Sequence, residues 1–571
     1  MNGLTPPPPS GASRGIYLEC GLIFLLVALV YATRIASPPV RGEESRRATA
    51  TIYFLETGNY IVPQQQGNIL YMSARPPAQN WLMLPFYALR HNMDALTIRL
   101  PSILAVAFTA ALLYFFARVW MPGAGAMTAA LAYPTMLQVM ELGRTAETDS
   151  VLTFFMTAGF FGWCYFHEAR QKAALAWIAG YAAIGLGTLT KGPQSPVYFF
   201  SATFVYLCWT KRWRDFFGWR HALGLCVYAL VVGAWLVPYF LLAGKTAVIH
   251  TFTGDVGVDQ TETAKSILTH FLSFPFLLLG CMLPWSVLLL LFLRRSIRDH
   301  ARPFSIPLRF AAIAFCCALP TVWLAPGSKT RFLLNMFPCV ALLVGIAVKC
   351  ACAVIENNNV DEKSARAAAA DLRCFTRLIG CLAFSAALVF LALSCYAAWT
   401  NKDIRFAMTR PRALFFAVIS IALASGLLAR RDLNGKPFLA SIFSVALFFG
   451  LLYNLPVVDY MDRWSQRNDL ALQDLWTKDL IPAASNLVSI EECPHSINYF
   501  HYLQRHATIS KVTLAQLKEM RQTNDVYYVS VHESFPLPHT ILARLPLRRY
   551  TYQRSYGEAA IIGKVPRASA P

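Results

Sequence analysis

Seven charged residues stand where they could do chemistry at a membrane surface. Glu43 and Glu44 follow the first apolar stretch of the chain, and Asp149 stands at the start of a later one. The cationic residues lie at the ends of other apolar stretches: Arg75, Lys191, Lys329 and Arg331. Removing a charge from water costs roughly several kcal/mol unless the charge is paired or hydrated. A shared aqueous cavity would explain why these residues are placed there.

The elements that must position these residues are membrane helices. Of the 571 residues, 56% are hydrophobic and 14% are charged, and the mean hydropathy is +0.43, which exceeds what a soluble core needs. A spanning helix needs about 20 apolar residues, so the sequence predicts an all-α polytopic membrane protein with about thirteen spans. These are expected near residues 16–36, 97–120, 123–141, 150–167, 174–190, 194–210, 221–243, 268–293, 307–325, 332–353, 378–399, 412–429 and 437–454.

Three further segments differ from the spans. Residues 1–15 are rich in Pro and Ser and are predicted to be disordered, and the apolar run after them, which has no convincing cleavage site, is interpreted as an uncleaved anchor. Residues 79–89 are short and contain Pro85, which favours a surface-lying or re-entrant helix. The loop at 37–96 is predicted to belong to the transmembrane domain of residues 16–454.

After residue 455 the chain changes to mixed charge with shorter apolar runs. The runs at 486–490, 525–531 and 559–562 predict strands, and the patterns at 496–504 and 514–521 predict helices. A small soluble C-terminal α/β domain over residues 455–571 is therefore expected. We find no catalytic constellation in it, since His495 and His501 are six residues apart and cannot share one helix face.

Basic residues in short loops predict the orientation. Four loops on one side carry them, and the positive-inside rule makes that side the cytoplasm. The residues are Arg170 and Lys172; Lys211, Arg212, Arg214 and Arg220; Arg294, Arg295, Arg298 and Arg302; and Arg430, Arg431 and Lys436. One loop disagrees, because an odd number of spans places its basic residues outside: Lys402, Arg405, Arg410 and Arg412. A missed or false span near 378–454 would move the tail to the other side.

Several function classes are disfavoured. The net charge of +20 is spread over loops without an aromatic-interleaved basic stripe, so no nucleic-acid partner is predicted; attraction to anionic membrane lipids explains it more simply. Of 14 cysteines, 13 lie in or beside predicted spans, which gives no disulfide framework. The chain has no CxxC, no HExxH and no Walker phosphate loop, which weakens redox, zinc-protease and ATPase interpretations.

Counting spans from an inside N-terminus places the seven charged residues on the outer side of the membrane. Their motifs occur in a fixed order: EESRRATATIYFLETGNYIVP, ARPPAQNW, RTAETDSVLTFF, LTKGP, MLPWS and SKTRFLLNMFP. Over about residues 16–350 this series resembles the polyprenyl-phosphate-sugar glycosyltransferases of the aminoarabinose lipid A transferase type, which are related to the protein O-mannosyltransferases. The resemblance implies a GT-C fold and transfer of a sugar from a polyprenyl-phosphate carrier, without a nucleotide, to an acceptor on the outer face.

The resemblance also implies roles for the carboxylates. Glu43 matches an aspartate of the family and is predicted to be the general base or to orient the acceptor, with Glu44 beside it. The longer Glu side chain moves the carboxylate oxygens by over about 1 Å, which could disturb the reacting geometry. The alternative is that both glutamates only pair with Arg41, Arg46 or Arg47. Asp149 is predicted to take part in catalysis, with Arg144 and Glu147 as nearby contributors, or else only to cap its helix.

The cations are predicted to bind the donor phosphate. A phosphodiester-linked sugar has a good leaving group once cations stabilise its phosphate, and a carboxylate can serve the attacking acceptor. Arg75 stands where the family usually has lysine, and arginine or lysine can bind phosphate. Lys191 could instead be a snorkelling anchor, and Lys329 and Arg331 could be plain loop charges. The family's metal-holding glutamate is Ala74 here, so no metal site is carried over, no cofactor is predicted, and a metal requirement is left open.

The predicted function is transfer of a sugar from a polyprenyl-phosphate donor to a lipid, such as lipid A, or to a cell-envelope glycan. The location expected is a bacterial inner membrane, with the site and the C-terminal domain facing the periplasm. A protein O-mannosyltransferase-like enzyme is one alternative. A lipid or glycan flippase or transporter is another, although it should show inverted repeats with interrupted helices, and the sequence shows no such self-similarity.

Overall fold

The structure is a computed structural model of the whole chain, and it divides into two compact units. The first, the helical unit, comprises residues 1–34, 71–79 and 100–459, and the second, the mixed unit, comprises residues 35–70, 80–99 and 460–571. The residues described are 13–37, 40, 43–65, 68–69, 75–121, 123–253, 264–357, 360–402, 404, 406–430, 435–462, 480–482, 485, 487–491, 493–531, 537–546 and 559–568. Most of the predicted disordered segment 1–15 lies outside these residues.

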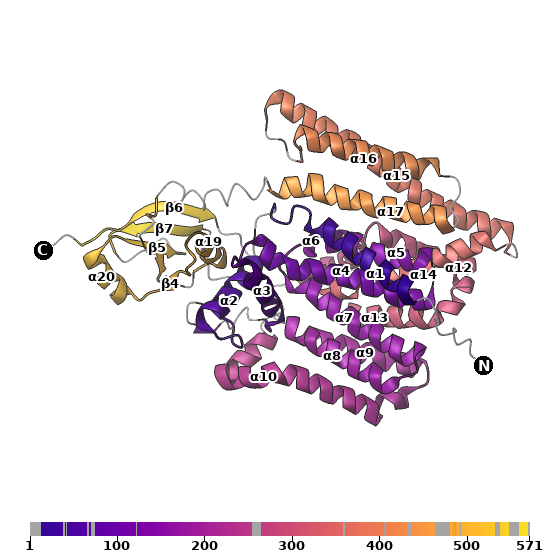
Figure 1. The fold of residues 1–571 in the computed structure, drawn as a ribbon, viewed down its shortest axis with the longest axis horizontal. Helices are drawn as coiled ribbons and strands as arrows, with labels where there is room; N and C mark the ends of the chain where they lie inside the picture. The colour runs from indigo at the N-terminus through magenta and orange to yellow at the C-terminus, as the bar shows by residue number, and fades with distance from the viewer. Residues whose placement is uncertain are drawn as a thin grey trace. The chain divides into compact units, whose positions relative to one another are not determined.

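Helices build the helical unit (Figure 1), and most of them are long and apolar, although α6 and α12 have only six residues each. They are α1 (Ser13–Ala32), α4 (Ala95–Trp120), α5 (Ala124–Ala132), α6 (Leu137–Leu142), α7 (Thr148–Cys164), α8 (Ala173–Lys191), α9 (Gln194–Trp209), α10 (Trp219–Thr253), α11 (Ala264–Cys281), α12 (Arg295–His300), α13 (Ser305–Trp323), α14 (Phe337–Glu356), α15 (Glu362–Thr400), α16 (Arg410–Ala429) and α17 (Gly435–Leu452). Short 3₁₀ or π segments join or extend them: η1 (Tyr133–Thr135), η2 (Tyr165–Ala169), η3 (Trp213–Phe216), η4 (Trp285–Leu293), η5 (Arg302–Phe304), η6 (Thr330–Met336) and η7 (Tyr453–Val457).

The helices confirm a polytopic membrane fold. In the described part of the chain, nine helices are long and apolar enough to cross a membrane, and the bent pair α11 and η4 would make a tenth crossing. The other predicted spans, at 123–141, 150–167 and 194–210, are also helical. Their helices have at most 17 residues each, which is short for a bilayer. The number thirteen therefore stays a prediction.

Two predicted spans are not single straight helices. The stretch 268–293 was expected to be one span, but α11 and η4 are bent by 108° between Cys281 and Trp285. Pro284 lies in this break, and proline favours one because it lacks an amide donor and restricts the residue before it. The stretch 123–141 is likewise interrupted at η1, where Pro134 stands.

Several polar contacts define one end of the helical unit. The carboxylate of Asp459, after η7, pairs with Arg34 after α1 at 2.5 Å and with Arg412 at the start of α16 at 2.9 Å. Arg144, before α7, donates to the carbonyl oxygens of Val30 and Thr33 at the end of α1. The loop before α16 therefore lies at the same end as the loop before α7. An odd number of spans predicts this arrangement, because it places the basic residues at 402–412 on the same side of the membrane as the loop before α7.

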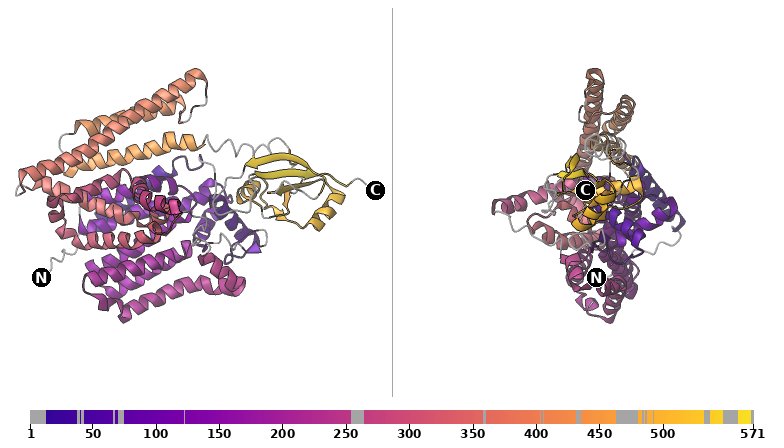
Figure 2. Two further views of the ribbon diagram at one scale, coloured as in Figure 1. Left: turned by 180° about the vertical axis from the view of Figure 1, so that it is seen from behind. Right: turned by 90° about the vertical axis from the view of Figure 1, so that its left-hand side faces the viewer.

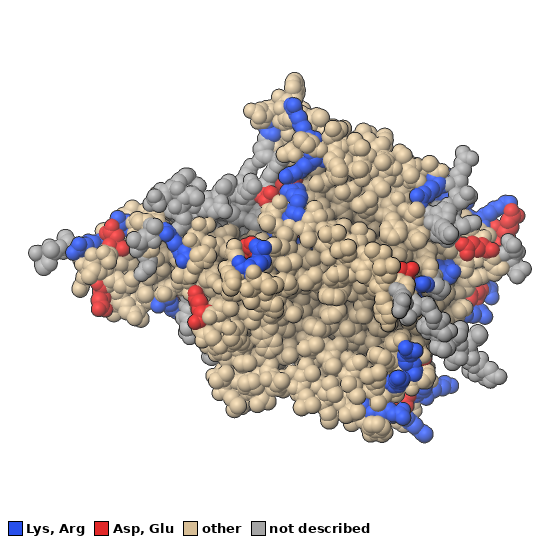
Figure 3. Space-filling model, in the orientation of Figure 1, with Lys and Arg blue, Asp and Glu red and all other residues tan. Residues whose placement is uncertain are grey.

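Charged residues avoid the sides of the helical unit. On the face drawn in Figure 3, Lys, Arg, Asp and Glu gather toward the two ends of the helices, and the surface between them is largely uncharged. This distribution is typical of helices surrounded by lipid, because a charge in the hydrocarbon layer is costly. Three aromatic residues that could have formed an interfacial belt, Trp235, Tyr239 and Trp285, are instead buried inside the unit, where Trp235 stacks on Tyr239.

A mixed sheet forms the core of the second unit. Its strands are β3 (Leu487–Ser489), β4 (Ser510–Lys511), β5 (Val526–Ser530), β6 (Thr540–Pro546) and β7 (Ala559–Val565), in the order β4-β3-β5-β7-β6. β3 is parallel to β4 and β5, and β7 is antiparallel to β5 and β6. Helices α19 (His495–Arg505) and α20 (Leu514–Thr523) connect the parallel strands. The predicted α/β character of the tail is confirmed; β4 and β6 were not predicted.

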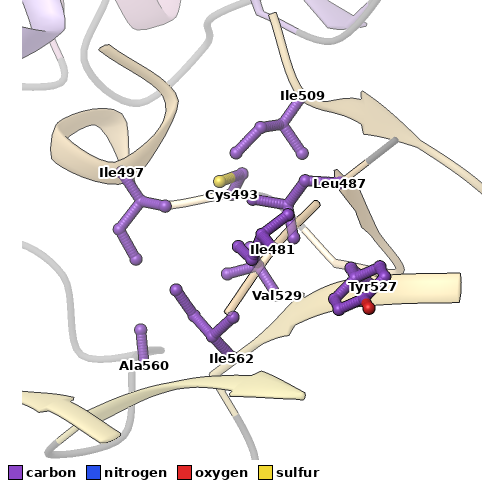
Figure 4. Packing of buried hydrophobic residues seen from close by; sticks show 9 residues of the cluster. All are labelled: Ile481, Leu487, Cys493, Ile497, Ile509, Tyr527, Val529, Ala560 and Ile562. Atoms are coloured by element: carbon purple, nitrogen blue, oxygen red, sulfur yellow. The ribbon is translucent and has the colours of Figure 1, made fainter. Parts of the chain in front are cut away.

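Apolar side chains from both faces hold this sheet together. Figure 4 shows one cluster, in which α19, the strands β3, β5 and β7, and the loop residues Ile481, Cys493 and Ile509 contribute side chains that face one another. Its members are Ile481, Leu487, Cys493, Ile497, Ile509, Tyr527, Val529, Ala560 and Ile562. A second cluster gathers around Leu517 of α20 and Tyr528 of β5. Alternate residues of β5 therefore supply the two clusters, as expected for a strand that is covered on both faces.

The first loop belongs to the same compact unit as the tail. Helix α2 (Glu43–Thr57), the short ribbon β1 (Gln64–Gln65) with β2 (Asn68–Ile69), and most of α3 (Ala78–Arg90) lie in the mixed unit. Asn498 of α19 donates to the hydroxyl of Tyr53 in α2 at 3.2 Å, and the hydroxyl of Tyr499 donates to the carbonyl oxygen of Met93 at 2.9 Å. The units thus cut across the predicted domain boundaries at residues 16–454 and 455–571.

We expect the first loop and the tail to face the same side of the membrane, because they pack within one unit. Thr57→Cys in α2 and Lys518→Cys in α20 should react alike with a membrane-impermeant maleimide added to the outside of intact spheroplasts. Arg295→Cys in the exposed α12 is the matched control and should react only after permeabilisation. Labelling of Lys518→Cys only after permeabilisation would contradict the arrangement.

The mixed unit is expected to lose stability in mild acid. Burial, with Arg46 and Arg47 nearby, lowers the pKa of His495 to about 3, and burial with Arg505 nearby lowers that of His501 to about 4. Both lie below the unfolded value of 6.5, so the unfolded chain binds more protons and stability falls as the pH drops through 6.5 toward the folded values. The unfolding temperature of the full-length protein should decrease from pH 7 to pH 5. His495→Asn should reduce this decrease; an identical decrease would contradict the role of His495.

Candidate active site

Six charged side chains meet at one end of the helical unit. They come from the segment before α3, the start of α7, the end of α8 and the start of η6. We call them the cationic cluster, and its members are Arg75, Glu147, Asp149, Lys191, Lys329 and Arg331. The cluster contains Asp149 and all four cations that the sequence predicts to bind the donor phosphate.

Lys191 is the last residue of α8, and its local sequence explains its position. Gly192 has φ 94°, a backbone conformation that glycine adopts without a steric penalty, and its amide donates to the carbonyl of Thr188. Pro193 then precedes α9, where its missing amide hydrogen is no loss. The tripeptide Lys-Gly-Pro therefore ends one helix, starts the next, and leaves Lys191 at the corner. The Lys191 ammonium lies 4.8 Å from the ring centre of Phe332.

Asp149 and Lys191 form a buried ion pair. The Lys191 ammonium donates to Asp149 Oδ1 at 2.5 Å, and the side chains are 4% and 5% exposed. The N-cap of α7 is Glu147, and Asp149 is the second residue of the helix. Asp149 is therefore not the N-cap residue of α7. Its carboxylate neutralises a buried cation, and it also interacts electrostatically with Arg75 and Arg331.

A second pair joins the start of α7 to η6. Arg331 donates to Glu147 Oε2 at 2.7 Å. Lys329 directly precedes η6. Burial lowers the pKa of the Lys329 ammonium, Arg331 lowers it further, and Glu147 opposes the shift. A phosphate bound beside Lys329 would favour its charged form. From the sequence Glu147 is only a nearby contributor, and the structure gives it Arg331 as a partner.

Gln194 is a positioning residue that the sequence analysis missed. Its side-chain amide donates to the carbonyl of Phe332 at 2.6 Å and to the Tyr198 hydroxyl at 3.0 Å. The first of these bonds ties the start of α9, three residues after Lys191, to η6 at Phe332, the residue after Arg331. A polar residue just after the Lys-Gly-Pro turn was the available signal, but its partner, a backbone carbonyl 138 residues away, could not be read from the sequence.

Arg75 completes the cluster from the loop before α3. Its side chain is half-buried, and it interacts electrostatically with both Asp149 and Lys191. Among the six residues of the cluster, the cations outnumber the carboxylates by four to two. Such an excess in a partly water-excluded place is suited to an anion with one or two negative charges.

Glu43 and Glu44 lie in the mixed unit and have different partners. Glu44 accepts from Arg99 at 2.7 and 2.8 Å, with side chains that are 2% and 3% exposed, and Arg99 also donates to the carbonyl of Ile35. Glu43 is partly exposed and pairs with Arg46 and, at 3.7 Å, with Arg47. Pairing of Glu43 within its own helix was one of the predicted alternatives, whereas the Arg99 partner of Glu44 was not foreseen. The catalytic roles of both glutamates stay predictions.

Glu44→Gln is expected to destabilise the fold much more than Glu43→Gln. Removing one partner of a buried ion pair leaves the other charge uncompensated, which costs about 3–5 kcal/mol. The side chain of Glu43 is 23% exposed, so water compensates part of the charge that Glu43→Gln leaves behind and the loss is smaller. Thermal unfolding of the full-length variants in detergent measures the difference. The double variant Glu44→Gln/Arg99→Met should recover most of the loss. Equal unfolding temperatures for the two single variants would contradict a structural role of Glu44.

The described residues contain no group of three or more His, Cys, Asp or Glu side chains placed to hold a metal ion. The cluster itself offers two carboxylates, each already paired with a cation. Ala74, the position that the resemblance aligns with a metal-holding glutamate, lies outside the described residues.

Comparison with known proteins finds similarity to transferases that are named for lipid-phosphate-linked sugars. Residues 74–237 match the family described as dolichyl-phosphate-mannose-protein mannosyltransferase. The undecaprenyl phosphate-alpha-4-amino-4-deoxy-L-arabinose arabinosyl transferase of Pseudomonas paraeruginosa is 26% identical over 315 residues, which are 54% of this chain and 55% of that protein. The Pseudomonas aeruginosa enzyme of the same name is 25% identical over 58% of this chain and 59% of that protein. The matches thus span little more than half the length of these relatives.

Solved structures extend the likeness to the whole fold. The crystal structure of ArnT from Cupriavidus metallidurans in the apo state has a TM-score of 0.67 and 15% identity, and the match covers 97% of this chain and 99% of that one. The structure of the same protein bound to undecaprenyl phosphate also gives 0.67 and 15%, over 98% and 100%. The chain is thus a polytopic membrane protein with the fold of ArnT.

The predicted resemblance is confirmed at this level. In sequence and in fold, the chain resembles the polyprenyl-phosphate-sugar glycosyltransferases of the aminoarabinose transferase type.

Proposed function

We propose that this chain is a membrane glycosyltransferase that moves a sugar from a polyprenyl-phosphate carrier to a lipid or cell-envelope glycan on the periplasmic face of a bacterial inner membrane. The observation that carries the proposal is the excess positive charge of the cationic cluster at one end of a lipid-embedded fold. A carrier phosphate is an anion, which suits the positive charge, and its own apolar chain holds it at the membrane surface, where the cluster lies.

The geometry supports a division of labour among the cations. Asp149 and Glu147 each hold one cation in place, which fixes Lys191 and Arg331 before any ligand binds and lowers the cost of ordering them. Arg75 and Lys329 stand beside them and would add positive charge at the phosphate. As the sugar leaves, negative charge grows on the phosphate oxygen, and cations aimed at that oxygen stabilise the transition state more than the ground state.

The reaction balances without a nucleotide. The bond between the anomeric carbon of the sugar and the phosphate oxygen breaks, and the electron pair stays with the polyprenyl phosphate. The acceptor oxygen forms the new bond to the anomeric carbon, and its proton passes to a carboxylate base. The resemblance implies Glu43 for that base. The relative of known structure was solved with undecaprenyl phosphate bound, which is the chemistry of the product carrier in this scheme.

The first test compares cell-envelope lipids and glycans from cells with and without the protein by mass spectrometry. A sugar that is missing from one lipid or glycan class supports the proposal and identifies the acceptor class. A sugar that is missing only from glycoproteins would favour a protein O-mannosyltransferase-like enzyme. Unchanged modification together with a changed distribution of a lipid between the two leaflets would favour the transporter interpretation.

A further inference from the structure

A short turn leads into the two site carboxylates of α7. Residues 143–147 join α6 to α7, Glu147 is the N-cap of α7, and Asp149 is its second residue. Each of these carboxylates holds one cation of the cationic cluster. The position of both ion pairs therefore depends on how this turn is fixed to the rest of the helical unit.

Arg144 fixes the turn to the end of α1. Its guanidinium donates to the carbonyl oxygen of Thr33 at 3.0 Å and to that of Val30 at 2.6 Å. Carbonyl groups at the end of a helix have no partner within the helix and carry partial negative charge, so a cation is stabilised there. Arg144 is only 7% exposed, so water hardly competes for these bonds.

Two tyrosine rings enclose the same guanidinium. Its central carbon lies 5.1 Å from the ring centre of Tyr31 in α1 and 5.2 Å from that of Tyr453 in η7. Both rings are buried, and a cation on an aromatic face is held more strongly when water is excluded. η7 extends α17, which runs beside the α15–α16 hairpin in Figures 1 and 2. Arg144 thus joins three segments that are far apart in the sequence.

Gly143 makes this close packing possible. A Cβ atom at Gly143 would lie 2.6 Å from Cε1 of Tyr31 and 2.9 Å from Cγ2 of Val106, which is closer than side chains pack. The turn is also closed on itself, because the amide and the hydroxyl of Thr145 both donate to the carbonyl oxygen of Leu142, at 3.2 and 2.8 Å. A larger residue at 143 would therefore push the turn away from α1.

The segments around the guanidinium are themselves held in place. The hydroxyl of Tyr31 donates to the carbonyl oxygen of Pro134 in η1 at 2.5 Å. The side-chain amide of Asn454 in η7 donates to the carbonyl oxygen of Val30 at 3.3 Å, and Arg34 donates to the carbonyl oxygen of Asn454 at 3.1 Å. The end of α1, η1 and η7 therefore form one fixed frame.

We propose that Arg144 is a positioning residue for the transfer reaction. Through the turn it fixes Glu147 and Asp149, and through these carboxylates it fixes the cations that bind the phosphate. The inference rests on the proposed function. The guanidinium is bound to backbone carbonyl groups and enclosed by aromatic rings, so its role is to hold the turn and not to bind the phosphate. A displacement of about 1 Å at a reacting group can lower the rate about 100-fold, so the fixing of this turn affects turnover.

The first test removes one ring and measures binding of undecaprenyl phosphate to the full-length protein in phosphatidylcholine nanodiscs. Tyr453→Leu leaves Arg144 its two carbonyl bonds, so the variant should fold, and binding should weaken about tenfold. Tyr453→Phe keeps the ring and should bind like the wild type. Unchanged binding in Tyr453→Leu would overturn the inference.

Tyr114→Leu is the matched control. Tyr114 is also buried and also lies beneath an arginine, with the central carbon of Arg118 5.9 Å from its ring centre. Its hydroxyl donates to Glu19, near the start of α1, whereas Tyr31 lies near the end of that helix. Tyr114→Leu should lower the unfolding temperature and leave undecaprenyl phosphate binding unchanged. A loss of binding equal to that of Tyr453→Leu would show a general effect of stability and would overturn the inference.

A double-mutant cycle shows whether the ring acts through the ion pair. Lys191→Met/Asp149→Asn removes the pair that the turn positions, so adding Tyr453→Leu to this variant should weaken undecaprenyl phosphate binding much less than about tenfold. Equal losses in the two backgrounds would mean that Arg144 acts independently of the pair, which contradicts a positioning role.

Hydrogen exchange of the amides at residues 143–150, measured by mass spectrometry, needs no substrate. Exchange should be faster in Tyr453→Leu and unchanged in Tyr453→Phe and Tyr114→Leu, because local exchange reports local opening. Unchanged exchange in Tyr453→Leu would overturn the inference whatever the binding result. Faster exchange, beside a wild-type protein that neither binds undecaprenyl phosphate nor transfers a sugar, would overturn the proposed function and leave the anchoring of the turn standing.

Discussion

Lys191→Met/Asp149→Asn is expected to fold normally and to lose donor binding. The pair is buried, so removing both charges together avoids the cost of an uncompensated charge, which is about 3–5 kcal/mol. The phosphate site then loses a charge-assisted contact worth about 1.5–3 kcal/mol, which corresponds to about 10- to 100-fold in kcat/KM. Binding of undecaprenyl phosphate to the purified protein, measured beside the unfolding temperature, separates the two effects.

The single variants provide the controls for this pair. Asp149→Asn alone should lower the unfolding temperature, because Lys191 keeps its charge without its partner, and Lys191→Met alone should do the same for Asp149. Arg75 is a half-buried member of the cluster. Arg75→Gln should weaken undecaprenyl phosphate binding without loss of stability. Wild-type binding in both Arg75→Gln and the double variant would remove the phosphate-site interpretation.

The sequence predicted the class of fold because the signal for membrane helices is strong and local. About 20 apolar residues in a row suffice to predict a span, and helices occur at every predicted span. Breaks within spans were harder to predict. Pro284 lies in the break between α11 and η4, whereas Pro238 and Pro320 lie inside helices. A proline alone therefore does not show whether a membrane helix will bend or break.

Pairings among the site residues could not be predicted, because they join residues that are far apart in the sequence. Which residues carry charge at a membrane surface is visible in the sequence, and the ordered motifs indicated Asp149, Lys191 and Arg331. Their partners depend on tertiary packing: Lys191 meets Asp149 across 42 residues, and Arg331 meets Glu147 across 184. Glu44 was grouped with Glu43 because the two are adjacent, but successive residues of a helix point in different directions, and Glu44 is held by Arg99.

Glu43→Gln is expected to abolish turnover while undecaprenyl phosphate binding and stability stay close to wild type. The substitution keeps the shape and hydrogen bonding of the side chain but removes the negative charge, so a carboxylate that accepts the acceptor's proton can no longer do so. General-base catalysis contributes about 10²–10⁴-fold, which sets the expected decrease in kcat. Glu43 is 23% exposed and its pairs with Arg46 and Arg47 lie within one helix, so the loss of stability should be smaller than that of Glu44→Gln.

Glu56→Gln is the matched control for Glu43→Gln. Glu56 lies in the same helix, α2, and its exposed carboxylate accepts a hydrogen bond from the hydroxyl of Thr508. Turnover should be unaffected in this variant. Glu43→Asp restores the residue type of the related transferases and should keep most of the activity if the carboxylate is the base. Single-turnover kinetics with a polyprenyl-phosphate sugar in nanodiscs decide the question. A normal rate in Glu43→Gln, beside an inactive but folded Asp149→Asn, would transfer the role of base to Asp149.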